Sequence, residues 1–167
     1  NYTYAAPGTY NVTFTAQSDI GCGSSVSFPV VVNTIPVAAF ASDVVCANTA
    51  TSFTDQSTDG SGAIDTWNWD VLNDGSVDYT TQNPQHTFTA GGTYNVALTV
   101  ESSTGCASPQ IVNTVDVNYI PVPDFTSDSV CVGLPTTLTD ASVVTNSTIA
   151  TWNWQYGDGN TGTGTPT

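Results

Sequence analysis

The feature that most constrains the fold of this chain is an internal repeat of 85 residues. Landmarks that recur at this spacing are Pro36 and Pro121, Cys46 and Cys131, and Trp67 and Trp152. A fixed period of this length marks one structural unit copied along the sequence, so it has to be settled before any fold is assigned. The complete unit of this chain runs from residue 36 to residue 120.

The two ends of the chain are similar to the two halves of a further unit. Residues 121–167 repeat the first part of the complete unit, and residues 1–35 repeat its last part. If the last residues of the chain are followed by its first residues, the joined sequence is similar to residues 80–88 of the complete unit. We therefore predict a C-terminal half-domain over 1–35, a complete domain over 36–120 and an N-terminal half-domain over 121–167. Residues 1–35 of a following copy would complete the last of these; a fragment with arbitrary ends is the alternative.

Hydrophobic and polar residues alternate in two stretches of the unit. Every second position is apolar over residues 67–71 and again over residues 94–100. Successive side chains of a strand point to opposite faces, so this period of two predicts strands with one buried face. The large aromatic residues expected in the cores are Trp67, Trp69 and Tyr94, with their counterparts Trp152, Trp154 and Tyr10.

Turn residues divide the unit into seven short strands. They are expected over residues 36–42, 51–55, 65–71, 77–79, 86–89, 94–101 and 111–117. No stretch of useful length has the 3.6-residue period of an amphipathic helix. Short strands separated by frequent turns are typical of β-sandwiches, so we predict an all-β chain of tandem sandwiches.

The charge composition excludes several classes of function. The sequence has no Lys or Arg and fourteen acidic residues, which gives a net charge of −14. Such a chain cannot neutralise phosphate groups, so nucleic acid is not expected as a partner. It contains no apolar run of about 18 residues, so it is not predicted to span a membrane. Abundant Thr, Ser, Asn and Val favour an extracellular β-protein.

The four cysteines occur in two dipeptide motifs, each present twice. Val-Cys lies early in the unit, at Cys46 and Cys131, and Gly-Cys lies late in it, at Cys106 and Cys22. Within the complete unit we predict a disulfide between Cys46 and Cys106. Closing a loop of about 60 residues would stabilise the domain by roughly 4 kcal/mol. If the end of one copy continues into the start of the next, Cys131 and Cys22 become partners by the same rule. The alternative is that the cysteines are free thiols. Disulfides would place the protein outside the cytosol.

An acidic turn follows the Trp-containing strand. Its oxygen-bearing side chains resemble part of a calcium loop and are Asp70, Asn73, Asp74 and Asp78. The match is incomplete, because the third and twelfth positions of such a loop would be Leu72 and Thr81. Calcium is the one cofactor that this turn suggests, and a solvated turn is the alternative. No catalytic residue is predicted, since the single histidine, His86, has no nucleophile in a recognisable setting.

Three stretches carry a resemblance to a known family. They are Trp-x-Trp-x-Tyr-Gly-Asp-Gly over 152–159, Asn-Pro-x-His-Thr-Phe over 83–88, and Gly-Thr-Tyr-x-Val-x-Leu-x-Val over 92–100. In this order they resemble the PKD domain, which implies a seven-stranded, immunoglobulin-like sandwich in each unit. The complete unit departs from the family's Gly-Asp-Gly turn by an extra residue near Asp74. The Val-Cys and Gly-Cys pairs resemble PKD repeats of very large surface proteins of Bacteroidota, including gliding-motility adhesins exported by the type IX secretion system.

This resemblance implies a structural role without catalysis. We expect a stalk segment of a repetitive cell-surface adhesin or filament, which projects a binding tip. Its partners would be neighbouring identical repeats joined head to tail, with lateral self-association or surface glycans as further contacts. The alternative is a carbohydrate-binding accessory module of a secreted polysaccharide-degrading enzyme, for which the aromatic candidates are Tyr2, Tyr79 and Tyr119.

Overall fold

The computed structural model describes residues 1–164, which form twelve strands and no helix. No helix that could cross a membrane is therefore present in this part of the chain. The strands are β1 (Gly8–Gln17), β2 (Gly23–Val32), β3 (Phe40–Ser42), β4 (Ala50–Asp55), β5 (Ile64–Asp70), β6 (Gln85–Thr87), β7 (Gly92–Ser102), β8 (Ile111–Val117), β9 (Phe125–Ser127), β10 (Leu138–Asp140), β11 (Asn153–Gln155) and β12 (Thr161–Thr163). The predicted all-β fold is confirmed.

The described residues belong to two compact units. The first comprises residues 1–43, 52–86 and 95–115, and the second comprises residues 44–51, 87–94 and 116–167. Strands β7 and β8 contribute residues to both units.

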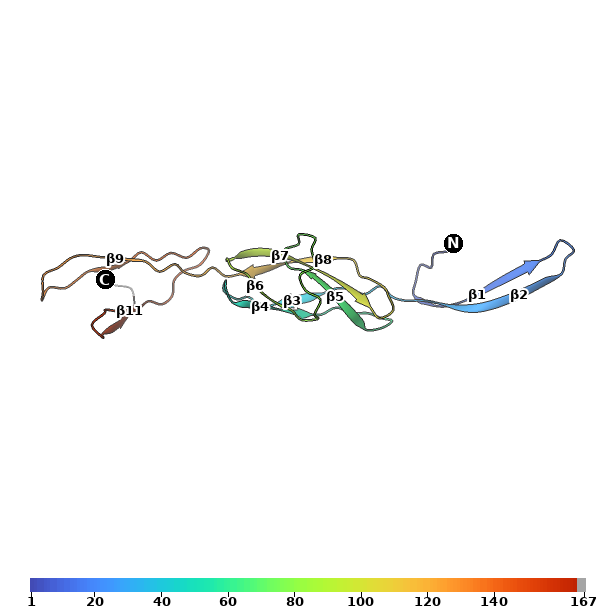
Figure 1. The fold of residues 1–167 in the computed structure, drawn as a ribbon, viewed down its shortest axis with the longest axis horizontal. Helices are drawn as coiled ribbons and strands as arrows, with labels where there is room; N and C mark the ends of the chain where they lie inside the picture. Colours follow the sequence, from blue (N-terminus) through green and yellow to red (C-terminus); the bar gives the residue numbers. More distant parts are fainter. Residues whose placement is uncertain (165–167) are drawn as a thin grey trace. The chain divides into compact units, whose positions relative to one another are not determined.

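Residues 36–120 form two sheets of three strands (Figure 1). One has the strand order β3-β4-β6, and the other has the order β5-β7-β8. Strands β5 and β7 are antiparallel, with Trp67 opposite Val100 and Trp69 opposite Leu98. Both alternating stretches of the sequence are thus neighbouring strands of one sheet, and the period of two predicted each of them.

One predicted strand, over residues 77–79, forms only a single bridge between Tyr79 and Trp69. The backbone N–H of Asp78 donates to the carbonyl of Trp69 at 2.7 Å, which begins a ladder. The N–H of Val71, the residue after β5, instead donates a hydrogen bond to the side chain of Asp78 at 2.7 Å. A side chain therefore takes the place of a backbone acceptor, and the ladder stops there.

The core of this region is built on three aromatic side chains. Phe40, Phe53 and Trp69 come from β3, β4 and β5, so they join the two sheets. The ring centroids of Phe40 and Trp69 are 5.0 Å apart, and those of Phe53 and Trp69 are 5.5 Å apart. Trp69 is fully buried, and its Nε1 donates to the carbonyl of Thr81 at 3.0 Å. Of the six predicted core aromatics, Trp69 is buried and the other five are half-buried.

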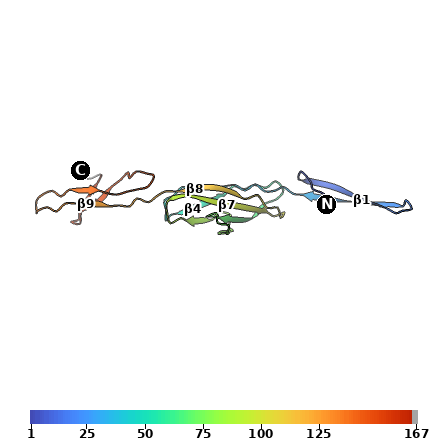
Figure 2. The ribbon, with the colours of Figure 1, turned by 90° about the horizontal axis from the view of Figure 1, so that it is seen from above.

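The N-terminal segment, in which Figure 2 labels β1, repeats local contacts that residues 36–120 make. In the complete unit, Tyr94 stacks on Phe88 at 4.1 Å and donates its hydroxyl to the carbonyl of Ala90 at 2.8 Å. Tyr10, at the matching place in β1, stacks on Tyr4 at 4.3 Å and donates to the carbonyl of Ala6 at 2.9 Å. Strands β1 and β2 pair antiparallel over ten residues each.

The C-terminal segment repeats contacts of the first part of the unit. It contains two small sheets, β9 with β10 and β11 with β12. Phe125 and Trp154 lie edge to face at 5.4 Å, as Phe40 and Trp69 do in residues 36–120. The two end segments thus carry complementary halves of one contact set, with the tyrosine hydrogen bond in one and the tryptophan pair in the other.

Candidate functional site

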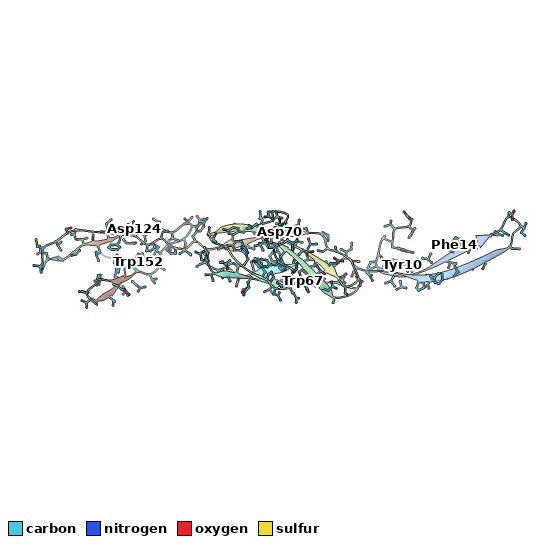
Figure 3. All side chains as sticks on the ribbon, viewed as in Figure 1. Tyr10, Phe14, Trp67, Asp70, Asp124 and Trp152 are labelled. Atoms are coloured by element: carbon cyan, nitrogen blue, oxygen red, sulfur yellow. The ribbon has the colours of Figure 1, made fainter. Side chains whose placement is uncertain are left out.

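A hydrogen bond between a tryptophan and an aspartate occurs at the same place in both repeats. Nε1 of Trp67 donates to Oδ2 of Asp55 at 2.9 Å, and Nε1 of Trp152 donates to Oδ2 of Asp140 at 2.8 Å. We call this contact the Trp–Asp clasp; Figure 3 labels both tryptophans. Sequence analysis placed the tryptophans in cores and missed the aspartates. The signal that could have found them is Thr-Asp-x-Ser, which occurs at residues 54–57 and 139–142.

Hydrogen bonds lower the pKa of the aspartate in each clasp. Burial alone would raise the pKa of Asp55, but hydrogen bonds from Ser57, Gln82 and Trp67 outweigh it, so this pKa is lowered. Hydrogen bonds from Ser142 and Trp152 likewise lower the pKa of Asp140. Each bond is made to the charged carboxylate, which it stabilises relative to the protonated acid.

Acid is expected to destabilise the central domain in part through Asp55. A carboxyl group whose pKa is lowered by folding stabilises the folded state above its unfolded pKa, about 3.9, and this contribution is lost as the pH falls through the folded pKa. We expect the free energy of unfolding from urea titrations to fall between about pH 5 and pH 2, and Asp55→Asn to flatten that fall. Asp65→Asn, on the exposed Asp65, is the matched control. Equal pH profiles for the two variants would contradict this role.

The acidic turn between β5 and Tyr79 is organised by backbone amides. Asp70, labelled in Figure 3, is 5% exposed. Its Oδ1 accepts from the N–H of Asp74 at 2.9 Å, and its Oδ2 accepts from the N–H of Gly75 at 2.8 Å. Asp78 accepts from the N–H of Val71 at 2.7 Å. The acids of this turn therefore satisfy the amides of a tight loop that contains the extra residue.

These contacts do not fit the predicted calcium site. Calcium needs six to eight oxygen ligands gathered about one point. Within residues 1–164, no group of three or more His, Cys, Asp or Glu side chains could hold a metal ion. The candidates Asp70, Asn73, Asp74 and Asp78 lie within residues 70–78, and the three carboxylates among them accept from separate backbone N–H groups. The sequence showed the residue types of a calcium loop without showing where the oxygens point.

All four cysteines are free thiols in this structure, so the predicted disulfide between Cys46 and Cys106 is absent. Cys106 lies beside the last residue of β7, because its carbonyl accepts from the N–H of Ser102 at 2.9 Å. Cys46 instead forms a bridge with Asn118, the residue that follows β8. The two thiols are therefore anchored at different strand ends.

Contacts of β7 locate each of these two cysteines along the chain. Thr93, at the start of β7, donates to Asp116 at 2.6 Å, and Asp116 is two residues before Asn118. Cys46 is thus tied to the beginning of β7, and Cys106 to its end. The pairings of Cys46 with Cys106 and of Cys22 with Cys131 therefore stay predictions, which this structure with its four free thiols does not show.

The remaining sequence candidates have structural contacts. The hydroxyl of Tyr79 lies 3.0 Å from Nδ1 of His86, so both side chains belong to one polar contact. Tyr79 and Tyr119 are half-buried, and the backbone of Tyr119 lies against Gly91 so closely that a Cβ there would be 2.6 Å from its Cα. Tyr2 is 81% exposed and packs edge-on against Tyr4 at 4.9 Å. Of the three aromatic glycan candidates, Tyr2 alone is exposed.

The two end segments expose the side chains that the complete unit buries. Val96 and Leu98 of β7 are 0% exposed, whereas Val12 and Phe14 at the matching places of β1 are 42% and 67% exposed. Phe40 of β3 is 8% exposed, whereas its counterpart Phe125 is 54% exposed. The same sequence pattern thus gives buried residues in one copy and bare ones in the other. We call the face of β1 and β2 that carries Phe14 the hairpin face.

The C-terminal segment also contains a hollow next to its exposed aromatic side chains. It has a volume of about 550 Å³ and is lined by Phe125, Trp152 and Trp154, among other residues. Asp124 and Asp140 also line it, and Figure 3 shows Asp124 and Trp152 in this segment. An apolar hollow rimmed by acids can accept an apolar side chain or an aromatic-stacking ligand. We call it the aromatic hollow.

Two three-stranded sheets, an aromatic core between them and the Tyr94 hydrogen bond define the complete unit as an immunoglobulin-like β-sandwich. The PKD domain family matches residues 33–117. The chain belongs to this family, and the resemblance seen in the sequence is confirmed.

Solved structures with similar chains include two domains of the same name. The PKD1 domain of Vibrio anguillarum Epp is 28% identical with a TM-score of 0.42, and 51% of this chain covers 98% of it. The PKD1 domain of the Vibrio cholerae metalloprotease PrtV is 30% identical with a TM-score of 0.42, and 50% of this chain covers all of it. A structure titled for carbohydrate-binding modules of the β-sandwich superfamily is 19% identical with a TM-score of 0.46, and 64% of this chain covers 53% of it. No curated protein matches the chain.

Proposed function

We propose that this chain is a spacer segment of a long extracellular stalk made of tandem PKD domains. The observation that carries the proposal is the repetition of the Trp–Asp clasp and of the Phe–Trp core pair, 85 residues apart. Consecutive units that repeat their structural contacts suit a protein whose useful property is length. The stalk would belong to a bacterial cell-surface adhesin or filament, such as the gliding-motility adhesins of the type IX system.

Two features of the chain suit that role. The connections between units are short, since residues 33–35 and 118–120 separate β2 and β8 from the prolines that begin the next units. Short connections of this kind hold neighbouring domains at limited angles. The absence of Lys and Arg removes the cleavage sites of trypsin-like proteases and gives every unit the same sign of charge, so neighbouring stalks repel one another.

The test is the shape of the full natural protein on its cell. Electron microscopy with antibodies against residues 36–120 should show label along thin projections from the surface. Small-angle scattering of soluble arrays should give a maximum dimension that grows in proportion to the number of repeats. A compact particle whose size grows with the cube root of the repeat number would reject the spacer role.

A second candidate, a carbohydrate-binding module, is favoured by the aromatic hollow. Trp152 and Trp154 line this hollow beside two carboxyl groups, and sugar rings stack on aromatic side chains of this kind. Retention of the chain on insoluble polysaccharides, lost in Trp154→Ala and kept in the exposed Leu134→Ala control, would support this candidate. No retention on any of a panel of polysaccharides would leave the spacer role.

A further inference from the structure

We propose that disulfides of the natural protein cross the joints between consecutive units, residues 33–35 and 118–120. Cys46 would pair with the Gly-Cys cysteine of the following unit, and Cys106 with the Val-Cys cysteine of the preceding unit. This inference rests on the proposed function, because it needs units that follow one another in a tandem array. It deepens that role, since every joint of the stalk then holds a covalent bond besides the peptide chain.

The first argument is the position of Cys46 at the joint that follows the complete unit. Cys46 forms a bridge with Asn118, the first residue of that joint. The N–H of Asn118 donates to the carbonyl of Val45 at 2.8 Å, and the N–H of Ala47 donates to the carbonyl of Asn118 at 2.9 Å. Backbone hydrogen bonds on both sides of the cysteine therefore fix the Val-Cys turn, residues 45–48, to the joint. Cys46 itself is exposed.

The second argument is the loop of the following unit that lies beside Cys46. A hollow of about 510 Å³ is lined by Cys46 together with Thr145, Asn146 and Ser147 of the C-terminal segment. Residues 145–147 are the repeat counterparts of residues 60–62, which lie 85 residues earlier. The Val-Cys turn of one unit thus faces this loop of the next unit.

The complete unit shows what else this loop contacts. A Cβ at Gly62 would lie 2.9 Å from Oγ of Ser103. The N–H of Ser103 donates to the carbonyl of Ala63 at 2.8 Å. Ser103 begins the Gly-Cys loop, residues 103–106, and the carbonyl of Cys106 accepts from the N–H of Ser102 at 2.9 Å. The loop over residues 60–62 therefore lies directly against the Gly-Cys loop of its own unit.

The same loop is fixed to the joint that precedes the complete unit. The N–H of Thr34, in that joint, donates to Oγ of Ser61 at 2.8 Å, and the N–H of Gly60 donates to Oγ1 of Thr34 at 3.2 Å. Thr34 also donates its hydroxyl to the carboxylate of Asp59. The Gly-Cys loop of a unit thus lies close to the joint before that unit.

These contacts bring one cysteine of each type to every joint. The loop at residues 145–147 borders the Val-Cys turn of the complete unit, and its counterpart at residues 60–62 borders a Gly-Cys loop. In a completed following unit, both cysteines therefore lie next to one short loop. A disulfide needs Cα atoms within about 7 Å, which two turns beside the same three residues can reach. Each cysteine then has one partner, and each joint has one disulfide.

Formation of each link needs an oxidant. The two thiols lose two electrons and two protons as the sulfur–sulfur bond forms. An oxidant that carries a disulfide, of the kind found outside the cytosol, accepts them and becomes a dithiol. The link does not depend on ion pairs, and the absence of Lys and Arg leaves no such side chain to form one across a joint.

Peptide mapping of the full natural protein, isolated without reductant and with free thiols alkylated, tests the pairing. A protease that cleaves before Asp places the four cysteines in separate peptides, 19–42, 43–54, 78–115 and 128–139. We expect peptide 43–54 to be linked to the Gly-Cys peptide of the following unit, and peptide 78–115 to the Val-Cys peptide of the preceding unit. Where successive copies are identical, these partners are peptides 19–42 and 128–139.

The variant Cys46→Ser in the full protein is the control for this assignment. It should free the Gly-Cys peptide of the following unit and leave peptide 78–115 linked. A link between peptides 43–54 and 78–115, release of peptide 78–115 in the variant, free thiols throughout, or covalent multimers on non-reducing gels would each overturn the proposal. Links within units in an extended protein would reject this inference and keep the spacer role, whereas links across joints in a compact particle would do the reverse.

Discussion

Replacing Trp69 by alanine is expected to lower the melting temperature of the central domain, residues 36–120, by more than about 12 °C. Trp69 is fully buried, touches Phe40 and Phe53, and donates a hydrogen bond to Thr81. Truncating a buried tryptophan costs about 3–5 kcal/mol, a large share of the roughly 5–15 kcal/mol that stabilises a domain. Differential scanning calorimetry of the dilute chain measures the change.

Trp154→Ala is the matched control for this prediction. Trp154 occupies the same place in the next repeat, but it is half-buried, and its neighbour Phe125 is exposed. In dilute solution this substitution should leave the main transition of residues 36–120 unchanged. Equal losses of stability in the two variants would mean that the C-terminal segment is already a complete domain, and the division into one whole unit and two halves would be wrong.

Replacing Phe14 by aspartate is expected to weaken self-association of the chain at least about 100-fold, which corresponds to about 2.8 kcal/mol. If residues 1–35 of one copy complete residues 121–167 of another, Phe14 fills the place of Leu98, which is 0% exposed in residues 36–120. A carboxylate buried there without a partner is strongly unfavourable. Sedimentation should show the mass of the native chain rising with concentration and that of the variant remaining monomeric.

The control for Phe14→Asp adds the same charge to the same strand. Asn11→Asp changes a residue whose counterpart in the complete unit, Asn95, is exposed, so association should persist. Both variants should keep the native melting temperature in dilute solution, because Phe14 is itself 67% exposed in the free chain. Equal loss of association in both would indicate a general effect of charge and contradict docking through the hairpin face.

The features that sequence analysis predicted correctly depend on local pattern. The period of two around Trp69 and Leu98 predicted two strands, and both residues are buried. The stretch from residue 92 to residue 100 predicted the family, and residues 33–117 match it. Such signals survive in sequence because strand geometry acts on consecutive residues.

The points that sequence analysis missed, or that stay predictions, depend on where individual side chains point. The pairing of Cys46 with Cys106 assumed that one pair per unit closes within that unit, but spacing does not say which strand end each cysteine occupies. Asp70 and Asp78 had the composition of a calcium loop, yet an extra residue directs their carboxylates to backbone amides. Asp55 was missed because its partner Trp67 lies on another strand. In each case the direction of a side chain decided the outcome.

The measurement that tests the central claim most directly is hydrogen–deuterium exchange of backbone amides below and above the onset of self-association. If residues 1–35 and 121–167 are halves of one domain, amides of β1 and β11 should become protected together as the copies associate, while those of β3, β4 and β5 stay unchanged. Association without new protection in β1 and β11, or full protection of both strands in the dilute monomer, would contradict the claim.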